Sequence, residues 1–128
     1  MLKIKTYVAK STIPNAGNGL FADQDVSKGT LIWQLNLIDK VIPIGTLIHL
    51  SEQERIYLEK YAYKSNENLI LCSDDGKYIN HSINPNLEDY IDPKFGSVTV
   101  AKIDIKQGDE LLSNYANFDD DSKIDIKF

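Results

Sequence analysis

The sequence has few of the residues that build metal centres and covalent cross-links. Cys72 is its only cysteine, so an intrachain disulfide and a cysteine-built zinc site are both excluded. Its two histidines, His49 and His81, lie far apart and show neither the HxxxH nor the HxH spacing of zinc ligands. We therefore expect no bound metal.

Long apolar runs are also lacking. No stretch approaches the roughly 20 apolar residues that a membrane-spanning helix needs, and the N-terminus has no apolar signal segment. We therefore expect a cytoplasmic protein that makes no contact with a membrane.

The length and composition suit a single globular domain. The chain has 128 residues, of which 42% are hydrophobic and 26% are charged. Its formal net charge is −5, so it gains nothing from the counterion release that drives nucleic-acid binding, and no direct nucleic-acid contact is expected. An acidic surface can attract a basic partner through its long-range field, and it can equally serve only to keep a protein in solution.

Short apolar segments between turn residues predict a β-rich chain with one main helix. Ser51 and Glu54 form an S-x-x-E capping box, and apolar residues follow at helical spacing, so we expect a helix over about 52–64. Turns and short strands are expected over residues 40–50, and a turn at residues 74–76. The remaining strands are expected over residues 3–8, 19–22, 30–37, 69–72, 98–103 and 111–114.

Two segments share one pattern. Residues 22–29 and residues 101–108 both read A-x-x-D-[VI]-x-x-G. Each predicts a strand, a turn and a second strand, with the glycine at positive φ.

Three short motifs carry the polar residues of a candidate site. They are Gly17-Asn18-Gly19-Leu20, then Asn80-His81-Ser82-Ile83-Asn84-Pro85-Asn86, and finally Gly108-Asp109-Glu110-Leu111-Leu112-Ser113-Asn114-Tyr115. The two glycines of the first predict a tight turn or a bare backbone against a ligand, but no third glycine and no helix follow, so a dinucleotide-binding fold is excluded. No Ser-x-Gly elbow accompanies His81, and Tyr115 read alone could be a buried aromatic residue.

In this order and at this spacing, the three motifs resemble the SET domain family of protein-lysine methyltransferases. The resemblance covers about residues 8–118. It implies a mainly β, β-rich α+β fold of several short sheets, with one main helix near 52–64 and a C-terminal pseudoknot that brings Tyr115 beside Asn80. It also implies a SET domain over residues 1–118, with a variable insert at about 40–72, and a short acidic tail over residues 119–128.

The resemblance further implies a methyltransferase site that uses S-adenosylmethionine. Tyr115 would be the catalytic residue, and Tyr78, Ser113 and Phe118 would line the substrate channel. Ser113 stands where the family often has Phe or Tyr, which leaves the number of transferred methyl groups open. The implied cofactor-binding residues are Gly17, Asn18, Gly19, Leu20, Asn80, His81, Tyr115 and Phe118.

The implied substrate is a lysine of a basic protein or peptide, with a histone tail as one candidate. The alternative is a non-catalytic SET-like module that binds a peptide or cofactor without turnover. Small viral or bacterial SET proteins are similar in lacking flanking domains, and a bare domain often completes its substrate groove with a second copy, so a homodimer is one expectation. If the protein is viral or secreted, a host nucleus is the alternative location.

Overall fold

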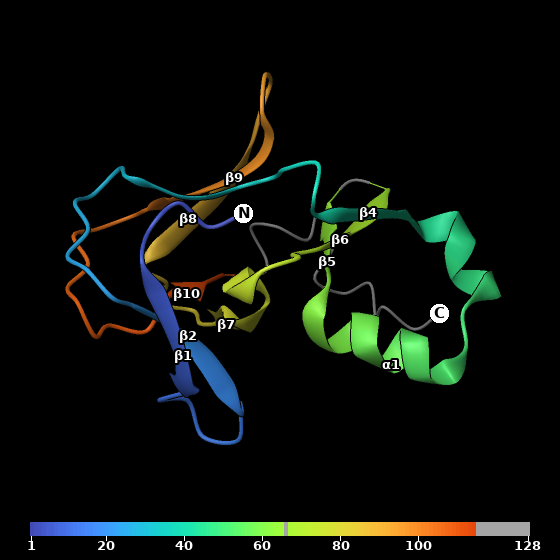
Figure 1. The fold of residues 1–128 in the computed structure, drawn as a ribbon, viewed down its shortest axis with the longest axis horizontal. Coiled ribbons are helices and arrows are strands. Elements are labelled where there is room, and N and C mark those ends of the chain that lie inside the picture. The colour runs from blue at the N-terminus through green and yellow to red at the C-terminus, as the bar shows by residue number, and fades with distance from the viewer. Residues whose placement is uncertain (66, 115–128) are drawn as a thin grey trace.

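The computed structural model describes residues 1–65 and 67–114, and these residues form a mainly β fold, as predicted (Figure 1). Their strands make four small sheets, ordered β1–β2, β10–β7, β3–β9–β8 and β4–β6–β5. No helix in the described ranges is long and apolar enough to cross a membrane. The elements in chain order are β1 (Thr6–Lys10), β2 (Asn18–Ala22), β3 (Leu31–Gln34), β4 (Lys40–Pro43), the 3₁₀ helix η1 (Ile44–His49), α1 (Glu52–Tyr61), β5 (Tyr63–Ser65), β6 (Asn68–Leu71), the 3₁₀ helix η2 (Asp75–Tyr78), β7 (Asn80–His81), β8 (Leu87–Asp92), β9 (Gly96–Ala101) and β10 (Leu112–Ser113).

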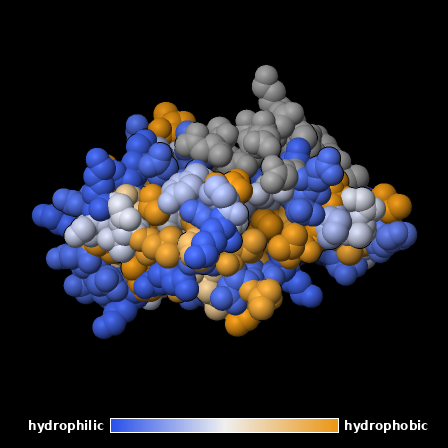
Figure 2. Space-filling view, turned by 90° about the horizontal axis from the view of Figure 1, so that it is seen from above, coloured by the Kyte–Doolittle hydropathy of each residue, from blue (hydrophilic) through white to orange (hydrophobic). Residues whose placement is uncertain are grey.

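The elements gather at two ends of the molecule. The sheet β4–β6–β5 lies with α1 at one end, and the sheets β1–β2 and β3–β9–β8 lie at the other, with β7 and β10 drawn between β8 and β2 (Figure 1). Each end has its own buried apolar cluster, one including Leu20, Ile32 and Leu111 and the other including Leu58 and Leu69. Seen from above, hydrophobic residues gather near the middle of the molecular face (Figure 2).

The two segments with the repeated sequence pattern pair with each other. Val26 and Ile105 exchange both backbone hydrogen bonds, with N···O distances of 2.7 and 2.8 Å. The two glycines, Gly29 and Gly108, have φ values of 87° and 92°, so the predicted left-handed turns are confirmed. Each glycine also donates its N–H to the alanine carbonyl that opens the other segment.

The aspartates of the two segments complete this symmetric exchange. Asp104 accepts a hydrogen bond from the Lys28 N–H, and Asp25 accepts one from the Gln107 N–H, at 2.8 and 2.9 Å. A short Asp side chain can cap a backbone N–H in this way without leaving its own turn. The repeat is therefore a paired structure that ties residues 22–29 to residues 101–108.

The C-terminal run lies directly beside the NHS segment. Strand β10 pairs with β7 in parallel, with Leu112 opposite Asn80 and Ser113 opposite His81. The Ser82 N–H continues this pairing by donating to the Ser113 carbonyl at 2.9 Å. Residues more than 30 positions apart thus meet at the centre of the molecule.

Asn86 holds the same C-terminal run from the other side of the loop. Its amide donates to the Glu110 carbonyl at 2.8 Å, and its Oδ1 accepts from the Leu112 N–H at 2.9 Å. An Asn side chain can satisfy a backbone donor and acceptor together because it carries both groups. Both ends of the loop over residues 82–86 therefore contact the run, as the expected pseudoknot requires; Tyr115 lies outside the described residues.

Helix α1 begins as predicted and ends earlier. The Ser51 hydroxyl accepts from the Glu54 N–H, and the Glu54 carboxylate accepts from the Ser51 N–H, which confirms the capping box. The helix ends at Tyr61, because Ala62 is extended and Tyr63 already pairs with β6. The expected end near residue 64 is wrong, since the backbone there hydrogen-bonds in a sheet.

Two 3₁₀ helices and three of the described strands, β5, β7 and β8, depart from the predicted elements. Residues 44–49 form η1 where turns and short strands were expected. The predicted turn at residues 74–76 extends into η2, whose first turn is capped by the Asp74 side chain through the Gly76 N–H. Strand β8, which the alternation of residues 87–92 did not predict, pairs with β9 over six residues in a hairpin.

Candidate active site

A buried carboxylate organises the turn that carries the first glycine motif. Glu110 Oε2 accepts hydrogen bonds from the Ser11 hydroxyl at 2.8 Å and from the Asn80 amide at 3.2 Å. Its Oε1 accepts from the N–H and the hydroxyl of Thr12, at 2.8 and 2.6 Å. Burial alone raises the pKa of Glu110, but the hydrogen bonds from Thr12, Ser11 and Asn80 outweigh it and hold the pKa below its usual range.

The two glycines of the motif serve different purposes. Gly17 has a φ of 74°, so it forms the left-handed turn, and nothing lies within 4 Å of where a Cβ would be. Gly19 lies within β2, and a Cβ on it would come within 2.4 Å of Glu110 Oε2. The Asn80 side-chain amide holds the turn by donating a hydrogen bond to the Asn18 carbonyl at 3.0 Å. The first two motifs are thereby joined through side chains.

A large cavity opens between these two motifs and α1. Its volume is about 490 Å³, within the range of small-molecule pockets in proteins. Four of the predicted cofactor-binding residues line it, whereas Gly19 and Leu20 are buried behind it. The lining residues are Ile13, Ala16, Gly17, Asn18, Lys60, Tyr61, Lys77, Tyr78, Asn80 and His81.

Aromatic rings and two lysines form one side of the larger cavity. The rings of Tyr61 and Tyr78 lie edge to face with centroids 6.0 Å apart. Lys77 Nζ lies 5.5 Å from the Tyr61 ring and 5.4 Å from the Tyr78 ring, and Lys60 Nζ lies 5.2 Å from the Tyr61 ring. A hydrogen bond to the Tyr57 hydroxyl raises the pKa of Lys77. This side of the cavity therefore presents positive charge, which suits an anionic group on a ligand.

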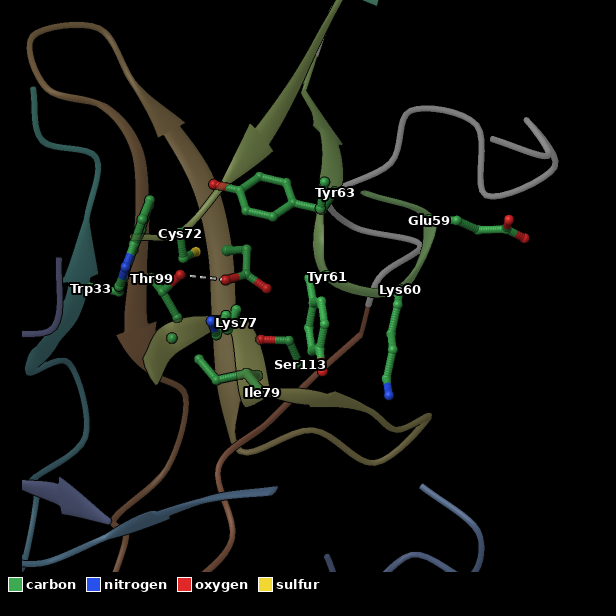
Figure 3. A pocket seen from close by; sticks show the side chains of 13 residues that line it. Trp33, Glu59, Lys60, Tyr61, Tyr63, Cys72, Lys77, Ile79, Thr99 and Ser113 are labelled. Atoms are coloured by element: carbon green, nitrogen blue, oxygen red, sulfur yellow. Dashed lines mark hydrogen bonds between the residues drawn. The ribbon is translucent and has the colours of Figure 1, made fainter. Parts of the chain in front are cut away.

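A second, narrower pocket adjoins the larger cavity. The two share Lys60, Tyr61 and Lys77 as lining residues, and the narrower one has a volume of about 130 Å³ (Figure 3). Most of its walls are apolar or aromatic, which sets it apart from the polar glycine turn. Its other lining residues are Trp33, Glu59, Ala62, Tyr63, Cys72, Gly76, Ile79, Asp89, Thr99 and Ser113.

Asp89 brings a carboxylate into the smaller pocket. Its Oδ1 accepts a hydrogen bond from the Thr99 hydroxyl at 2.5 Å, the dashed line in Figure 3, whereas its buried Oδ2 has no hydrogen-bond partner among the described residues. Burial raises the pKa of Asp89 to about 6; the hydroxyls of Thr99 and Ser113 lower it, and the charge of Glu88 raises it further. Asp89 is thus a carboxylate poised to change charge near neutral pH.

Two further polar groups of the smaller pocket, the Tyr63 hydroxyl and the Cys72 thiol, stay uncharged at neutral pH. The hydroxyls of Tyr63 and Ser97 lie 3.1 Å apart, and burial, with a smaller contribution from Cys72, raises the pKa of Tyr63 well above its usual range. Burial raises the pKa of Cys72 to about 12. The Trp33 Nε1 is also buried and has no acceptor within residues 1–65 and 67–114. A ligand here would meet the buried acid Asp89 and the open indole donor of Trp33.

The structure separates the residues predicted for the substrate channel. Ser113 lines the smaller pocket, Tyr78 lines the larger cavity, and Phe118, like Tyr115, lies outside the described residues. Sequence reasoning did not single out Glu110 or Asp89. Glu110 stands inside the quoted acidic-Leu run, while Asp89 has no local signal, because only its burial distinguishes it from the neighbouring exposed Glu88.

Metal coordination has no support in the described ranges. Among residues 1–65 and 67–114, no three or more His, Cys, Asp and Glu side chains gather closely enough to hold a metal ion.

Comparison with known proteins places this arrangement in context. Residues 17–116 match the family model described as SET domain. The histone-lysine N-methyltransferase SETD7 of Halocynthia roretzi is 32% identical over 122 residues, a match that covers 85% of this chain and 31% of SETD7. The chain thus spans less than a third of that relative's length.

Two solved structures share the fold at low sequence identity. One is described as ctPRC2 in an autoinhibited conformation bound to S-adenosylmethionine, with a TM-score of 0.69, 22% identity and coverage of 92% of this chain and 16% of that chain. The other is the crystal structure of the Chaetomium thermophilum polycomb repressive complex 2, with a TM-score of 0.70, 22% identity and coverage of 88% and 15%.

Proposed function

We propose, since this chain belongs to the SET-domain family, that it is an S-adenosylmethionine-dependent protein-lysine N-methyltransferase. The observation that carries the proposal is the pair of adjoining cavities that share Lys60, Tyr61 and Lys77. One has the size and polar lining for a small molecule, and the other is narrow and mostly apolar, as an aliphatic side chain requires. The name of SETD7 and the ligand of the autoinhibited ctPRC2 structure support the same activity and cofactor.

The larger cavity fits S-adenosylmethionine in its chemistry. Gly17 leaves open space above the turn, and Asn18, Asn80 and His81 supply polar groups along one wall. Lys60 and Lys77 provide positive charge for the carboxylate of the amino-acid part, and the Tyr78 ring offers an apolar face for the adenine. When bound, the cofactor supplies an activated methyl group on a sulfonium.

The chain's own contribution would be positioning and the exclusion of water. Methyl transfer is an in-line displacement, so the amine must point along one line toward the donor, and an apolar channel keeps solvent away. Ser113 pairs with His81 of the larger cavity and also lines the smaller pocket, so it lies where the two meet. The proposed catalytic residue, Tyr115, follows two residues later and would orient the methyl donor through its hydroxyl.

The substrate would be a lysine in a basic protein or peptide. The net charge of −5 favours a Lys- and Arg-rich segment over an acidic one, and histone tails are among the candidates. A homodimer that completes the substrate groove is part of this proposal. A sedimentation mass equal to one chain at working concentration would rule the homodimer out.

The proposal is tested by binding and transfer measured together. Calorimetry with S-adenosylhomocysteine should detect binding, and methyl-labelled cofactor should transfer label to lysine in a panel of basic proteins that includes histones. Binding without transfer to any member would favour the non-catalytic module. Absence of cofactor binding at millimolar concentration would overturn the proposal.

Two variants separate chemistry from binding. Tyr115→Phe deletes one hydroxyl and should lower turnover by about a hundredfold or more, the scale seen when one preorganised polar group is lost from an active site. Its cofactor affinity should stay close to that of the parent. Asn80→Ala should weaken cofactor binding first, because the side chain holds the glycine turn through Asn18. A normally folded Tyr115→Phe protein with the parent rate would refute the assignment of Tyr115.

A further inference from the structure

The smaller pocket contains an acceptor, Asp89 Oδ2, that has no hydrogen-bond partner among the described residues, although the nearby Ser113 hydroxyl favours the charged form of the carboxyl. Asp89 is 8% exposed, its Oδ1 binds the Thr99 hydroxyl, and its Oδ2 has no partner among the described residues. A buried polar atom without a partner carries the full cost of leaving water, so native structures keep few of them. A ligand that brings a donor to Oδ2 would recover that free energy.

The walls of the pocket indicate which kind of donor fits. Trp33, Tyr63 and Ile79 provide apolar surface around a volume of about 130 Å³ (Figure 3), and Asp89 lines the same pocket. A carboxyl group in a narrow pocket with apolar walls favours a ligand with an aliphatic chain that ends in a cationic group. The side chain of lysine has that form, and the pocket adjoins the larger cavity, where the methyl donor would lie.

We infer that Asp89 Oδ2 receives the ε-ammonium of the substrate lysine, first as hydrogen-bond acceptor and then as proton acceptor. This inference rests on the proposed function. In the step, one N–H bond of the ammonium breaks and the proton moves to Oδ2, which leaves a neutral amine and a neutral carboxylic acid. The amine nitrogen then bonds to the methyl carbon of S-adenosylmethionine as the C–S bond breaks, and that electron pair stays on sulfur. Water removes the proton from Asp89 afterwards.

Burial brings the proton affinities of the two partners toward each other. In water, the lysine ammonium has a pKa of about 10.4, so its proton would not pass to a carboxylate. In the pocket, desolvation penalises both charged forms, which raises the pKa of the acid and lowers that of the ammonium. The raised pKa of Asp89, about 6, is the first half of this effect. The positive sulfonium nearby would lower the pKa of the ammonium further.

The titration of Asp89 can be observed separately from that of the other titratable groups that face the pocket. Tyr63 and Cys72 stay neutral in the working range because their pKa values are raised. The positive lysines lie at the boundary shared with the larger cavity, and Glu88 projects from β8 as an exposed residue. The remaining facing groups, from α1 and η2, are Glu59, Lys60, Tyr61 and Lys77.

The first experiment compares two acid-to-amide variants on the same strand. Asp89→Asn keeps the shape and can still accept from Thr99, but it cannot take a proton. For a lysine peptide it should lower kcat/KM at pH 8 by about a hundredfold or more, the usual scale for a general base. It should also remove the rise of kcat/KM with pH through about 6. Glu88→Gln removes the neighbouring exposed charge and should keep the parent rate at pH 8. Because the charge of Glu88 contributes to the raised pKa of Asp89, the rise of kcat/KM should persist and move only slightly, to lower pH.

The same experiment can overturn the inference. Asp89→Asn with the rate and pH profile of the parent would show that the carboxylate takes no part. A loss of rate that leaves the pH profile unchanged would make Asp89 a structural residue only, which also contradicts the inference.

A second measurement works on the parent protein and needs no turnover. The ¹³Cγ signal of Asp89 is titrated by NMR with n-butylammonium present, and with 1-pentanol as an uncharged molecule of similar length. The cation should lower the apparent pKa of Asp89 by about one unit or more, because an opposite charge favours the carboxylate, whereas the alcohol should not lower it. No response to the cation would overturn the inference.

These results are distinguishable from failure of the proposed function. Binding of S-adenosylhomocysteine with no response of Asp89 to n-butylammonium would leave the methyltransferase proposal in place and remove Asp89 from it. A response of Asp89 without any cofactor binding would support the cation pocket and remove the methyltransferase.

Discussion

The two carboxylates beside the candidate site, Glu110 and Asp89, are both buried but differ in the number of hydrogen bonds that they accept. Glu110 accepts four hydrogen bonds through its side chain, from Ser11, Thr12 and Asn80. Asp89 accepts one from Thr99 and keeps an oxygen without a partner among the described residues. The pKa of Glu110 is lowered and that of Asp89 is raised.

The difference separates structure from chemistry. A carboxylate whose oxygens are satisfied within the chain stays ionised and fixes the groups around it. A carboxylate left unsatisfied destabilises the fold and keeps its binding capacity for something that arrives later. We therefore assign Glu110 to the architecture of the larger cavity and Asp89 to the ligand of the smaller pocket.

Removing Glu110 should have the largest effect on stability. Glu110→Ala should lower the free energy of unfolding by roughly 3 kcal/mol or more, because several hydrogen bonds to a charged acceptor are lost and the buried Ser11 hydroxyl is left unpaired. Urea unfolding followed by circular dichroism measures the change. Glu88→Gln, at an exposed acid, is the control and should lie within about 0.5 kcal/mol of the parent. A small effect of Glu110→Ala would contradict the architectural role.

Asp89 should show the opposite pH dependence of stability. As pH rises from 3.8 to about 6, the unfolded chain releases this proton while the folded protein still holds it, so stability falls across this window. Stability from Glu110 runs the other way and is lost as pH falls through its lowered pKa. The difference in unfolding free energy between Asp89→Asn and the parent should therefore change by up to about 3 kcal/mol across the window.

Thermal or urea unfolding at several pH values between 4 and 8 measures this difference. As pH rises, the unfolding free energy of Asp89→Asn should increase relative to that of the parent, and the difference should stay constant above about pH 7. A difference that does not vary with pH would mean that Asp89 keeps an ordinary pKa when folded.

Local signals allowed part of the fold to be predicted, and long-range pairing decided the rest. The start of α1 could be predicted from the Ser51–Glu54 capping box, because both hydrogen bonds of the box form between these two residues. The end of the helix depends on the pairing of β5 with β6, which no local pattern reveals. The juxtaposition of β7 and β10 was available only through family resemblance, since parallel neighbours 32 residues apart leave no spacing signal.

The candidate site divides in the same way. Gly17, Asn18, Asn80 and His81 belong to recognisable motifs and line one cavity together. Asp89 could not be predicted, because it is adjacent to a second acid, Glu88, on the same strand. Adjacent residues of a strand point to opposite faces, and the sequence does not show which face is buried.

The two glycines of the first motif, of which only Gly19 contacts Glu110, sharpen the comparison further. Gly19→Ala should cost about 2 kcal/mol of stability, because its Cβ would meet Glu110 Oε2 at 2.4 Å and displace a carboxylate held by several partners. Gly17→Ala should cost about 1 kcal/mol, from its left-handed backbone alone.

A double-mutant cycle distinguishes the two causes. In a Glu110→Ala background, Gly19→Ala should cost clearly less than in the parent, while the cost of Gly17→Ala should be unchanged, because only the first pair is in contact. Additive costs for Gly19 and Glu110 would show that the contact is not responsible.

The smallest effect is expected away from both carboxylates. Ser51→Ala removes the N-cap of α1 and should lower the free energy of unfolding by about 1 kcal/mol, with cofactor affinity unchanged. Gln53→Ala, at an exposed position of the same helix, is the matched control and should change stability by less than about 0.5 kcal/mol. A loss of cofactor affinity in Ser51→Ala would show that α1 transmits its stability to the cavity.

The exchange between residues 22–29 and 101–108 has a consequence for how the protein is made. Its hydrogen bonds join residues 76 and 82 positions apart, and the neighbouring Leu20 carbonyl accepts the N–H of Leu111. During synthesis, the β1–β2 hairpin therefore leaves the ribosome with an unfinished apolar face, which waits for residues 101–111. Contacts of such long sequence separation fold slowly. The nascent chain is thus more exposed to aggregation and proteolysis until residues 101–111 have emerged.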